Sequence, residues 1–178
     1  MDVLVVVDMQ KDFCYENGAL YIGEHVRRIF DPLRRVIEGA REREIPIVFT
    51  QDWHREDDAE FKIWPKHCIA GSEGAEIIDE LDPRPGDIYV KKRRYSAFFG
   101  TDLDLTLREL VANGLIVAGV VTNICVLHTV ADAVMRGYEV TVLEDCTTAL
   151  NERDHEYGIE HMKNVLRAEI LRSDELWV

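Results

Sequence analysis

LIVAGVVTNICVLHTVADAVMRGYEVTVL, residues 115 to 143, decides the fold of this chain. An apolar, β-branched run at 115–120 leads into a helical apolar pattern, and after Gly137 a second run follows at 138–143. A strand, a helix and a second strand in this order form the repeating unit of a parallel sheet. Because the first run is apolar at nearly every position, we expect it to be buried on both faces, in the centre of a doubly wound sheet.

The same alternation extends through the rest of the chain. Further apolar runs stand at 3–7, 45–50 and 87–90, with a weaker one at 168–173, so that six strands are expected in all. Helix signals lie between them: Asp31 with Pro32 as N-cap and first helical residue, Thr101 with Asp104 as a capping box, and Gly114 and Gly137 after helix ends. We therefore predict an α/β fold in which helices connect parallel strands.

The composition is that of one acidic domain. The chain has 178 residues, 47% of them hydrophobic. Because domains commonly run to about 100–200 residues, we expect a single domain over 1–178. The 21 basic and 34 acidic residues give a net charge of −13, which disfavours binding to the phosphates of a nucleic acid.

The N-terminal residues and the spacing of the cysteines indicate in which cellular compartment the protein is expected. MDVLVVVDMQ at 1–10 has neither a basic head nor an apolar segment long enough to cross a bilayer, so we expect a cytoplasmic protein with no membrane partner. The cysteines at 14, 68, 125 and 146 form no CxxC pair, which argues against a disulfide framework and against a cysteine-rich zinc site. We interpret Cys14, Cys68 and Cys146 as structural.

Polar side chains follow four of the expected strands. Asp8 ends the first, Asp52 and His54 follow the second, Lys92 ends the third and Cys125 follows the fourth. Open parallel sheets bind ligands at the carboxyl ends of their strands, where the strand order reverses. In an order such as 3-2-1-4-5-6, Asp8 and Cys125 would flank that point.

Cys125 is a candidate nucleophile. It lies where a strand turns into a helix, and a helix N-terminus or a nearby cation lowers the pKa of a thiol. Lys92 can supply the cation and Asp8 the base, and backbone amides around Val121 and Cys125 can hold an oxyanion. The alternative is that Cys125 is a small buried hydrophobe, Asp8 caps a loop and Lys92 is a solvated charge.

The stretch QDWHREDDAEFKIWPKHC at 51–68 is a candidate metal site. Asp52 and His54 are two apart on an extended segment and point to the same side, and His67 completes a set of one carboxylate and two imidazoles. Such a set suits zinc, or iron or manganese, and Glu60 can serve as a fourth ligand or as an outer acceptor. The alternative is that both histidines hydrogen-bond to loop backbone.

Large aromatic side chains stand in the loops that leave the same edge of the sheet. We favour Phe13 and Trp64 as walls of a pocket for a flat ligand, whereas aromatic residues in loops otherwise pack on the domain.

Five segments together resemble the isochorismatase-like cysteine hydrolases. They are VVVDMQKDF at 5–13, TQDWH at 50–54, WPKHC at 64–68, VKKRRYSAFFGTDLD at 90–104 and GVVTNICVLHTVADAVMRGYEVTVLEDC at 119–146. The resemblance implies a three-layer, Rossmann-like fold whose six-stranded parallel sheet has the order 3-2-1-4-5-6, with helices on both faces. It also implies a catalytic triad of Asp8, Lys92 and Cys125, and a cis peptide between Val120 and Val121 that directs amides into the oxyanion hole.

Within this superfamily, DWH and WPKHC are similar to nicotinamidases. That similarity implies metal ligands at Asp52, His54 and His67 and substrate contacts from Phe13, Trp64 and Tyr95. It further implies that the pyridine nitrogen of nicotinamide binds the metal while Cys125 attacks the carboxamide. Ammonia would leave with a proton returned by Asp8, and water would hydrolyse the thioester to nicotinate.

Three positions depart from the nicotinamidase pattern. Arg55 replaces the proline of DWHP, Glu60 stands where many relatives carry a histidine, and RYSAF with Arg94 is closer to the wider superfamily, including N-carbamoylsarcosine amidases. A ureido substrate with a carboxylate would need a cation, which Arg93 or Arg94 can provide.

Four functions therefore stand beside one another. The first is hydrolysis of nicotinamide to nicotinate and ammonia, and the second is hydrolysis of N-carbamoylsarcosine or another small amide or ureido compound with the same triad. The third is a metallohydrolase in which Cys125 is a bystander, and the fourth is a non-catalytic binding domain. The apolar tail ELWV at 175–178 and the acidic surface are compatible with subunit contacts. Because members of the superfamily often assemble, the resemblance implies a homo-oligomer, whose number of subunits the residues do not fix.

Overall fold

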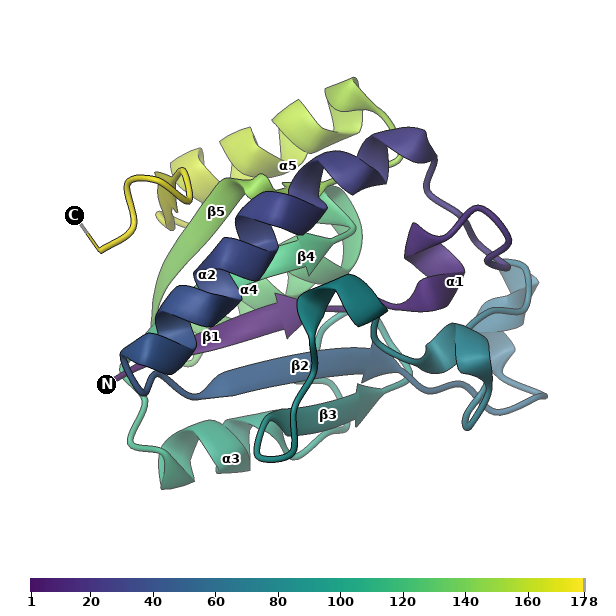
Figure 1. Cartoon of the computed structure of the whole chain (residues 1–178), viewed down its shortest axis with the longest axis horizontal. Coiled ribbons are helices and arrows are strands. Elements are labelled where there is room, and N and C mark those ends of the chain that lie inside the picture. The colour runs from purple at the N-terminus through teal and green to yellow at the C-terminus, as the bar shows by residue number, and fades with distance from the viewer. Residues whose placement is uncertain (178) are drawn as a thin grey trace.

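The centre of the molecule is a parallel sheet of six strands in the order β3-β2-β1-β4-β5-β6 (Figure 1). The computed structural model describes residues 1–177, and Val178 of the apolar tail lies outside the described residues. The strands are β1 (Asp2–Val7), β2 (Ile47–Asp52), β3 (Ile88–Lys92), β4 (Gly114–Val120), β5 (Glu139–Thr148) and β6 (Glu169–Leu171). All five pairings are parallel, which confirms the predicted sheet and its order.

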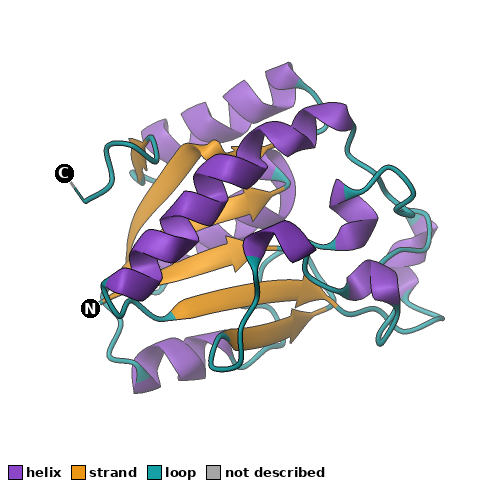
Figure 2. Ribbon diagram, in the orientation of Figure 1, coloured by secondary structure: helices purple, strands orange, loops and turns teal. Residues whose placement is uncertain are grey.

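Helices connect the strands and cover both faces of the sheet (Figure 2). The α-helices are α1 (Lys11–Cys14), α2 (Phe30–Glu42), α3 (Leu103–Glu109), α4 (Leu127–Met135) and α5 (Glu152–Asn164). Short 3-10 helices cover Glu24–Ile29, Ala59–Lys62, Glu73–Ala75 and Asp79–Leu81, and one turn of π-helix, Thr122–Val126, leads from β4 into α4. None of the described helices combines the length and apolar character needed to cross a bilayer.

The two faces of β1 enter two different cores. Leu4 and Val6 pack in a cluster with α2, which crosses the front of the sheet in Figure 1. Val3, Val5 and Val7 pack in a second cluster with buried side chains of α3, α4 and α5. Since successive side chains of a strand point to opposite faces, an all-apolar strand is what a sheet covered on both sides requires.

Two of the helix boundaries differ from the prediction. The 3-10 helix Glu24–Ile29 runs directly into α2, so Asp31 and Pro32 lie in the first turn of a helix that begins at Phe30, not at its N-cap. Gly114 is the first residue of β4, because α3 ends at Glu109.

Of the other two helix signals, Gly137 is found as predicted, whereas the capping box of Thr101 and Asp104 is not. Gly137 follows α4 with a φ of 85°, the left-handed conformation expected there. Thr101 accepts a hydrogen bond from the amide of Leu103, but Asp104 accepts one from the Tyr138 hydroxyl and so does not complete a capping box.

Gly119 brings the ends of β1 and β4 close together. Its φ is 113°, and a Cβ atom placed on it would lie 2.1 Å from the carbonyl oxygen of Val7. Only a residue without a side chain permits this approach. As a result, the loops that follow the two strands, one carrying Asp8 and the other Cys125, begin side by side.

Candidate active site

Asp8, Lys92 and Cys125 lie together in the interior at the carboxyl ends of β1, β3 and β4. The Lys92 ammonium nitrogen, Nζ, lies 2.7 Å from Asp8 Oδ2 and 3.5 Å from Cys125 Sγ. The same Nζ lies 2.6 Å from Asp52 Oδ1. Although Asp8, Asp52 and Cys125 are close enough to bind an ion, the Lys92 ammonium already provides the cation among them.

Strand register and one threonine position the acid and the amine. Lys92 is the register partner of Asp52, and Thr50 is the partner of Val7, which precedes Asp8. The Thr50 hydroxyl donates to Asp8 Oδ1 at 2.6 Å and accepts from the Asp8 amide at 3.2 Å. Apart from the Lys92 ion pair, Asp8 Oδ2 has no hydrogen-bond partner among the described residues, which leaves it free to accept a proton.

Burial controls the protonation of these groups. It raises the pKa of Asp8 to about 6, against the lowering effect of Lys92. Burial alone would lower the pKa of Lys92, but the carboxylates of Asp52 and Asp8 raise it well above its ordinary value. Burial also raises the pKa of Cys125, although Lys92 opposes the shift. The expected lowering of the Cys125 pKa is therefore not found, because burial outweighs the effect of Lys92. The Asp8 carboxylate lies beside the same ammonium group.

The residues before Cys125 line a cavity at the carboxyl ends of the strands, and Cys125 lines it too. The peptide between Val120 and Val121 is cis, and both residues line the cavity together with Cys125. The Val121 carbonyl accepts hydrogen bonds from the amides of Ile124 and Val126 at 3.0 and 3.2 Å.

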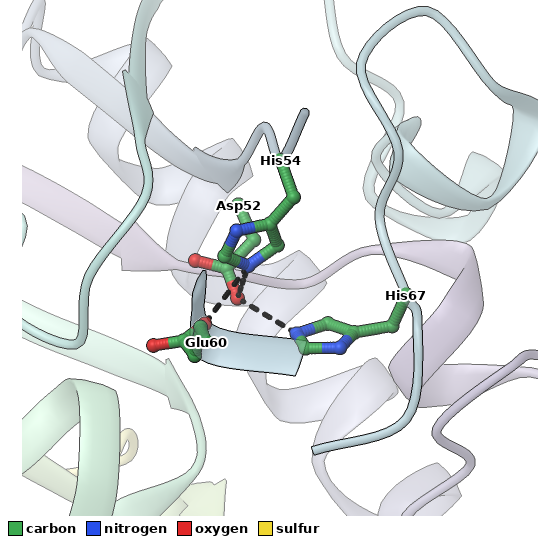
Figure 3. Close-up of side chains that lie close together, drawn as sticks. All are labelled: Asp52, His54, Glu60 and His67. Carbon is green, nitrogen blue, oxygen red and sulfur yellow. Dashed lines mark ion pairs between the residues drawn. The ribbon is translucent and has the colours of Figure 1, made fainter. Parts of the chain in front are cut away.

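Asp52, His54, Glu60 and His67 converge beside this triad (Figure 3). His54 Nε2 lies 3.0 Å from Glu60 Oε2 and 3.5 Å from Asp52 Oδ2, and His67 Nε2 lies 3.4 Å from the same Asp52 oxygen. All four side chains are buried, and one ligand atom from each lies within 4.8 Å of every other. Figure 3 shows the two Nε2 atoms and the two carboxylates directed at a common point.

The surroundings of the two histidines fit a metal ion at that point. His67 Nδ1 lies 2.7 Å from the carbonyl of Pro65, and His54 Nδ1 lies 3.1 Å from Asp58 Oδ2, so both rings use Nδ1–H as a donor and present Nε2 to the cluster. Apart from its close contacts with the Glu60 and Asp52 carboxylates, His54 Nε2 is buried with no hydrogen-bond partner among the described residues. Burial alone would lower the pKa of His54, but Asp52 and Glu60 raise it to about 10. A bound cation would take the place of that proton.

Asp58 is a buried carboxylate behind the cluster. Besides His54 it contacts Arg93 Nε, 2.8 Å from Oδ2, and Arg94 Nη1, 3.0 Å from Oδ1. Burial would raise the pKa of Asp58, but Arg93, the amide of Glu60 and His54 together hold it well below its usual range. Both guanidinium groups are thus directed at Asp58 and neither lines the cavity.

The cavity between the triad and the cluster has largely apolar walls. Its described lining consists of Phe13, Leu20, Ile22, Asp52, Glu60, Trp64, His67, Tyr95, Val120, Val121, Ile124, Cys125 and Leu150. Trp64 Nε1 donates to the Tyr95 hydroxyl at 3.0 Å, and the Phe13 ring lies 5.4 Å from that of His67. The structure therefore brings the three aromatic residues that sequence reasoning selected to one cavity.

Comparison with known proteins places the chain in a family. A model of the isochorismatase domain matches residues 2–175. The chain belongs to the isochorismatase family. Among solved members, nicotinamidase/pyrazinamidase PncA from Bacillus subtilis is 36% identical with a TM-score of 0.91, over 96% of this chain and 99% of that one.

Two further solved structures are similar to this chain. N-carbamoylsarcosine amidase from Thermoplasma acidophilum is 36% identical with a TM-score of 0.90, over 99% of both chains. Pyrazinamidase of Pyrococcus horikoshii, solved in complex with zinc, is 33% identical with a TM-score of 0.89, over 96% of this chain and 98% of that one.

Sequence reasoning missed three residues that support the site of this isochorismatase-family chain. They are Thr50, which contacts Asp8, Asp58, which contacts His54, and Gln10. Gln10 donates to the carbonyls of Asp52 and Ala75 at 2.8 and 2.9 Å and accepts from the amide of Asp52 at 2.8 Å. Gln10 and Thr50 lie in the segments VVVDMQKDF and TQDWH, close in sequence to Asp8 and Asp52, and this closeness could have identified them as supporting residues. Asp58 could not be identified in this way, because nothing in the spacing distinguishes it from its acidic neighbours.

Proposed function

We propose that this isochorismatase-family amidohydrolase cleaves nicotinamide to nicotinate and ammonia through a thioester on Cys125. The observation that supports this most strongly is the cavity itself, which joins a thiol, an acid and an amine to a cluster of metal-binding side chains between aromatic walls. A flat, uncharged ring with one carboxamide matches such walls.

Asp8, Lys92 and Cys125 carry the chemistry in this proposal. Asp8 accepts the thiol proton as Sγ attacks the carboxamide carbon, and backbone amides of Val121 and Cys125 hold the oxyanion. Lys92 keeps Asp8 ionised and stabilises the thiolate at 3.5 Å. Asp8 then returns the proton to the leaving ammonia and accepts one from the water that hydrolyses the thioester.

The ring is held by the other side of the cavity. Phe13 and Trp64 contact its faces, and Tyr95 fixes Trp64 through their hydrogen bond. Asp52, His54, His67 and Glu60 would hold a divalent metal, zinc first, with iron or manganese as alternatives. When bound, the metal supplies a Lewis acid that orients the ring nitrogen. The zinc complex of the Pyrococcus horikoshii relative supports this part of the proposal.

The second candidate is an N-carbamoylsarcosine amidase or another small amide or ureido hydrolase with the same triad, which the Thermoplasma acidophilum relative favours. A carboxylate on such a substrate needs a cation. In this chain Arg93 and Arg94 are both engaged by Asp58, whereas Asp52 and Glu60 bring negative charge to the cavity. The neutral carboxamide is therefore the better match.

Ammonia release from a panel of nicotinamide, pyrazinamide and N-carbamoylsarcosine tests the proposal. The metal-loaded protein should release ammonia fastest from nicotinamide, and Cys125→Ala should lose nearly all of this activity. Faster turnover of N-carbamoylsarcosine would favour the second candidate. Turnover that survives alkylation of Cys125 would show that the cysteine is not the nucleophile. Assembly with copies of itself and a cytoplasmic location stay predictions from the sequence.

A further inference from the structure

Arg93 and Arg94 directly follow Lys92, yet their guanidinium groups turn away from the cavity and toward Asp58. The side chain of Asp58 is 0% exposed, whereas those of Arg93 and Arg94 are 46% and 39% exposed. The arginines thus cover the carboxylate from the solvent side. A buried carboxylate beside the acids Asp52 and Glu60 needs such cations, because an unpaired charge in the interior is strongly unfavourable.

Asp58 makes four contacts, which is the number that the lone pairs of a carboxylate allow. Oδ2 accepts from His54 Nδ1 at 3.1 Å and from Arg93 Nε at 2.8 Å. Oδ1 accepts from the amide of Glu60 at 3.1 Å and from Arg94 Nη1 at 3.0 Å. Two of the contacts therefore fix residues of the metal cluster, and the other two fix Asp58.

The Arg94 backbone is held by the side chain of Lys92, the last residue of β3. The Arg94 carbonyl accepts from Lys92 Nζ at 2.8 Å, and the Lys92 carbonyl accepts from the amide of Trp53 at 2.8 Å, one residue before His54. The loop that carries His54 and Asp58 is therefore held from β3 in two ways. The Lys92 carbonyl binds its backbone, and the guanidinium groups of Arg93 and Arg94 bind Asp58.

We infer that Asp58, Arg93 and Arg94 act together as positioning residues for the metal site. Arg93 and Arg94 hold the Asp58 carboxylate in place, and Asp58 in turn orients the His54 ring and the Glu60 backbone so that Nε2 and the Glu60 carboxylate face the cation. The arginines thus serve the metal and not a substrate carboxylate. This inference rests on the proposed metal site and assigns residues outside its four ligands.

Metal affinity of the stripped protein tests this role without any substrate. Co²⁺ would be titrated against a competing chelator, with the visible absorption of bound Co²⁺ as the readout, for wild type, Asp58→Asn and the double variant Arg93→Gln/Arg94→Gln. Outer contacts to a ligand histidine typically change metal affinity by about 10–100-fold. We expect a loss in that range for Asp58→Asn, a loss of about tenfold for the double variant, and an altered Co²⁺ spectrum in both.

Arg55→Gln is the matched control, because Arg55 lies in the same loop and makes a two-pronged ion pair with the exposed Asp57. It should bind Co²⁺ as wild type does. The variant Arg93→Lys/Arg94→Lys keeps both charges and should recover part of the affinity that the glutamines lose. Thermal unfolding of each variant confirms that it folds, and if Asp58→Asn does not fold, the arginine variants still decide.

An Arg93→Gln/Arg94→Gln variant that binds Co²⁺ with the affinity of wild type would overturn the inference. If kcat/KM of this variant also fell for N-carbamoylsarcosine alone, the arginines would serve a substrate carboxylate and not the metal. A wild-type protein that binds no Co²⁺ would also overturn it. A wild-type protein that binds Co²⁺ but leaves nicotinamide intact would reject the proposed substrate while the positioning role stands or falls on the variants.

Discussion

Lys92 and Asp52 form an ion pair of 2.6 Å that joins the two halves of the site. Asp52 gives its Oδ1 atom to the ammonium group beside the thiol and turns Oδ2 toward the two histidines. One buried carboxylate thus contacts Lys92 of the candidate triad and both histidines of the candidate metal site, so that changes in one half are expected to reach the other.

Asp52→Asn should remove metal binding and hydrolysis together. The amide keeps the size of the side chain but loses the charge that both Lys92 and a cation require, so we expect metal affinity to fall by more than about 100-fold. Glu60→Gln is the comparison, because Glu60 contacts the cluster but not Lys92. Metal content is measured after dialysis, and hydrolysis is measured as ammonia release. If Asp52→Asn and Glu60→Gln lost metal and ammonia release to the same extent, the shared role of Asp52 would be contradicted.

Cys125→Ala should lower kcat for ammonia release by about 10³-fold or more, as the loss of a nucleophile does elsewhere, while Co²⁺ binding is retained. Cys146→Ala is the matched control, since Cys146 is also a buried free cysteine but does not line the cavity. It should lose stability and keep its turnover. Equal turnover in Cys125→Ala and Cys146→Ala would assign the thiol a packing role.

The pH dependence should report Asp8. Because burial raises its pKa to about 6, the basic carboxylate is present above that pH and is protonated below it. With saturating metal, kcat/KM should rise as pH increases through about 6 and then level off. The raised pKa also means that the folded protein binds this proton more tightly than the unfolded chain does, so its contribution to stability is present at low pH and is lost as pH rises through 6. A profile that is flat between pH 5 and 8 would exclude Asp8 as the base.

Thr50→Val should move the acidic limb of that profile to higher pH. The hydroxyl donates to Asp8 Oδ1 at 2.6 Å and stabilises the ionised form, so its loss should raise the pKa of Asp8 further. A stability loss of about 1 kcal/mol is expected for one such bond. The shift in pH separates this effect from simple destabilisation, which would lower activity at every pH alike.

Trp64→Ala should raise KM for nicotinamide by about tenfold, because a lost aromatic wall costs about 1–2 kcal/mol of binding, and should change kcat less. Trp64→Phe keeps a ring but not the donor to Tyr95, and is expected to lie between wild type and alanine. Steady-state kinetics on both variants check the order. A larger effect on kcat than on KM would place Trp64 nearer the chemistry than proposed.

The sheet was predictable because its pattern is local. Apolar runs such as 3–7 and 115–120 predict strands that are buried on both faces. Because the strands are parallel, the polar residues that follow them lie at the same edge of the sheet, formed by the carboxyl ends of the strands. Helix ends were less predictable. A 3-10 helix before α2 moved its start to Phe30, a boundary that depends on backbone geometry and not on the capping residue type.

The supporting contacts of the site could not be predicted from the sequence, because they too depend on the folded geometry of the chain. Asp58 follows other acids in REDD at 55–58, and only the folded loop selects it to meet His54 and two arginines 35 and 36 residues away. The expected lowering of the Cys125 pKa also failed, because burial and two neighbouring carboxylates outweigh the effect of one lysine.

The missing side chain at Gly119 limits how this architecture can diversify. Any larger residue would meet the Val7 carbonyl and push β4, which leads to Cys125, away from β1, which leads to Asp8. New specificities are therefore more accessible at the outer wall, where Leu20 and Leu150 line the cavity on loops that carry no part of the triad. A directed-evolution library aimed at other amides should vary those two positions and leave the junction of β1 and β4 untouched.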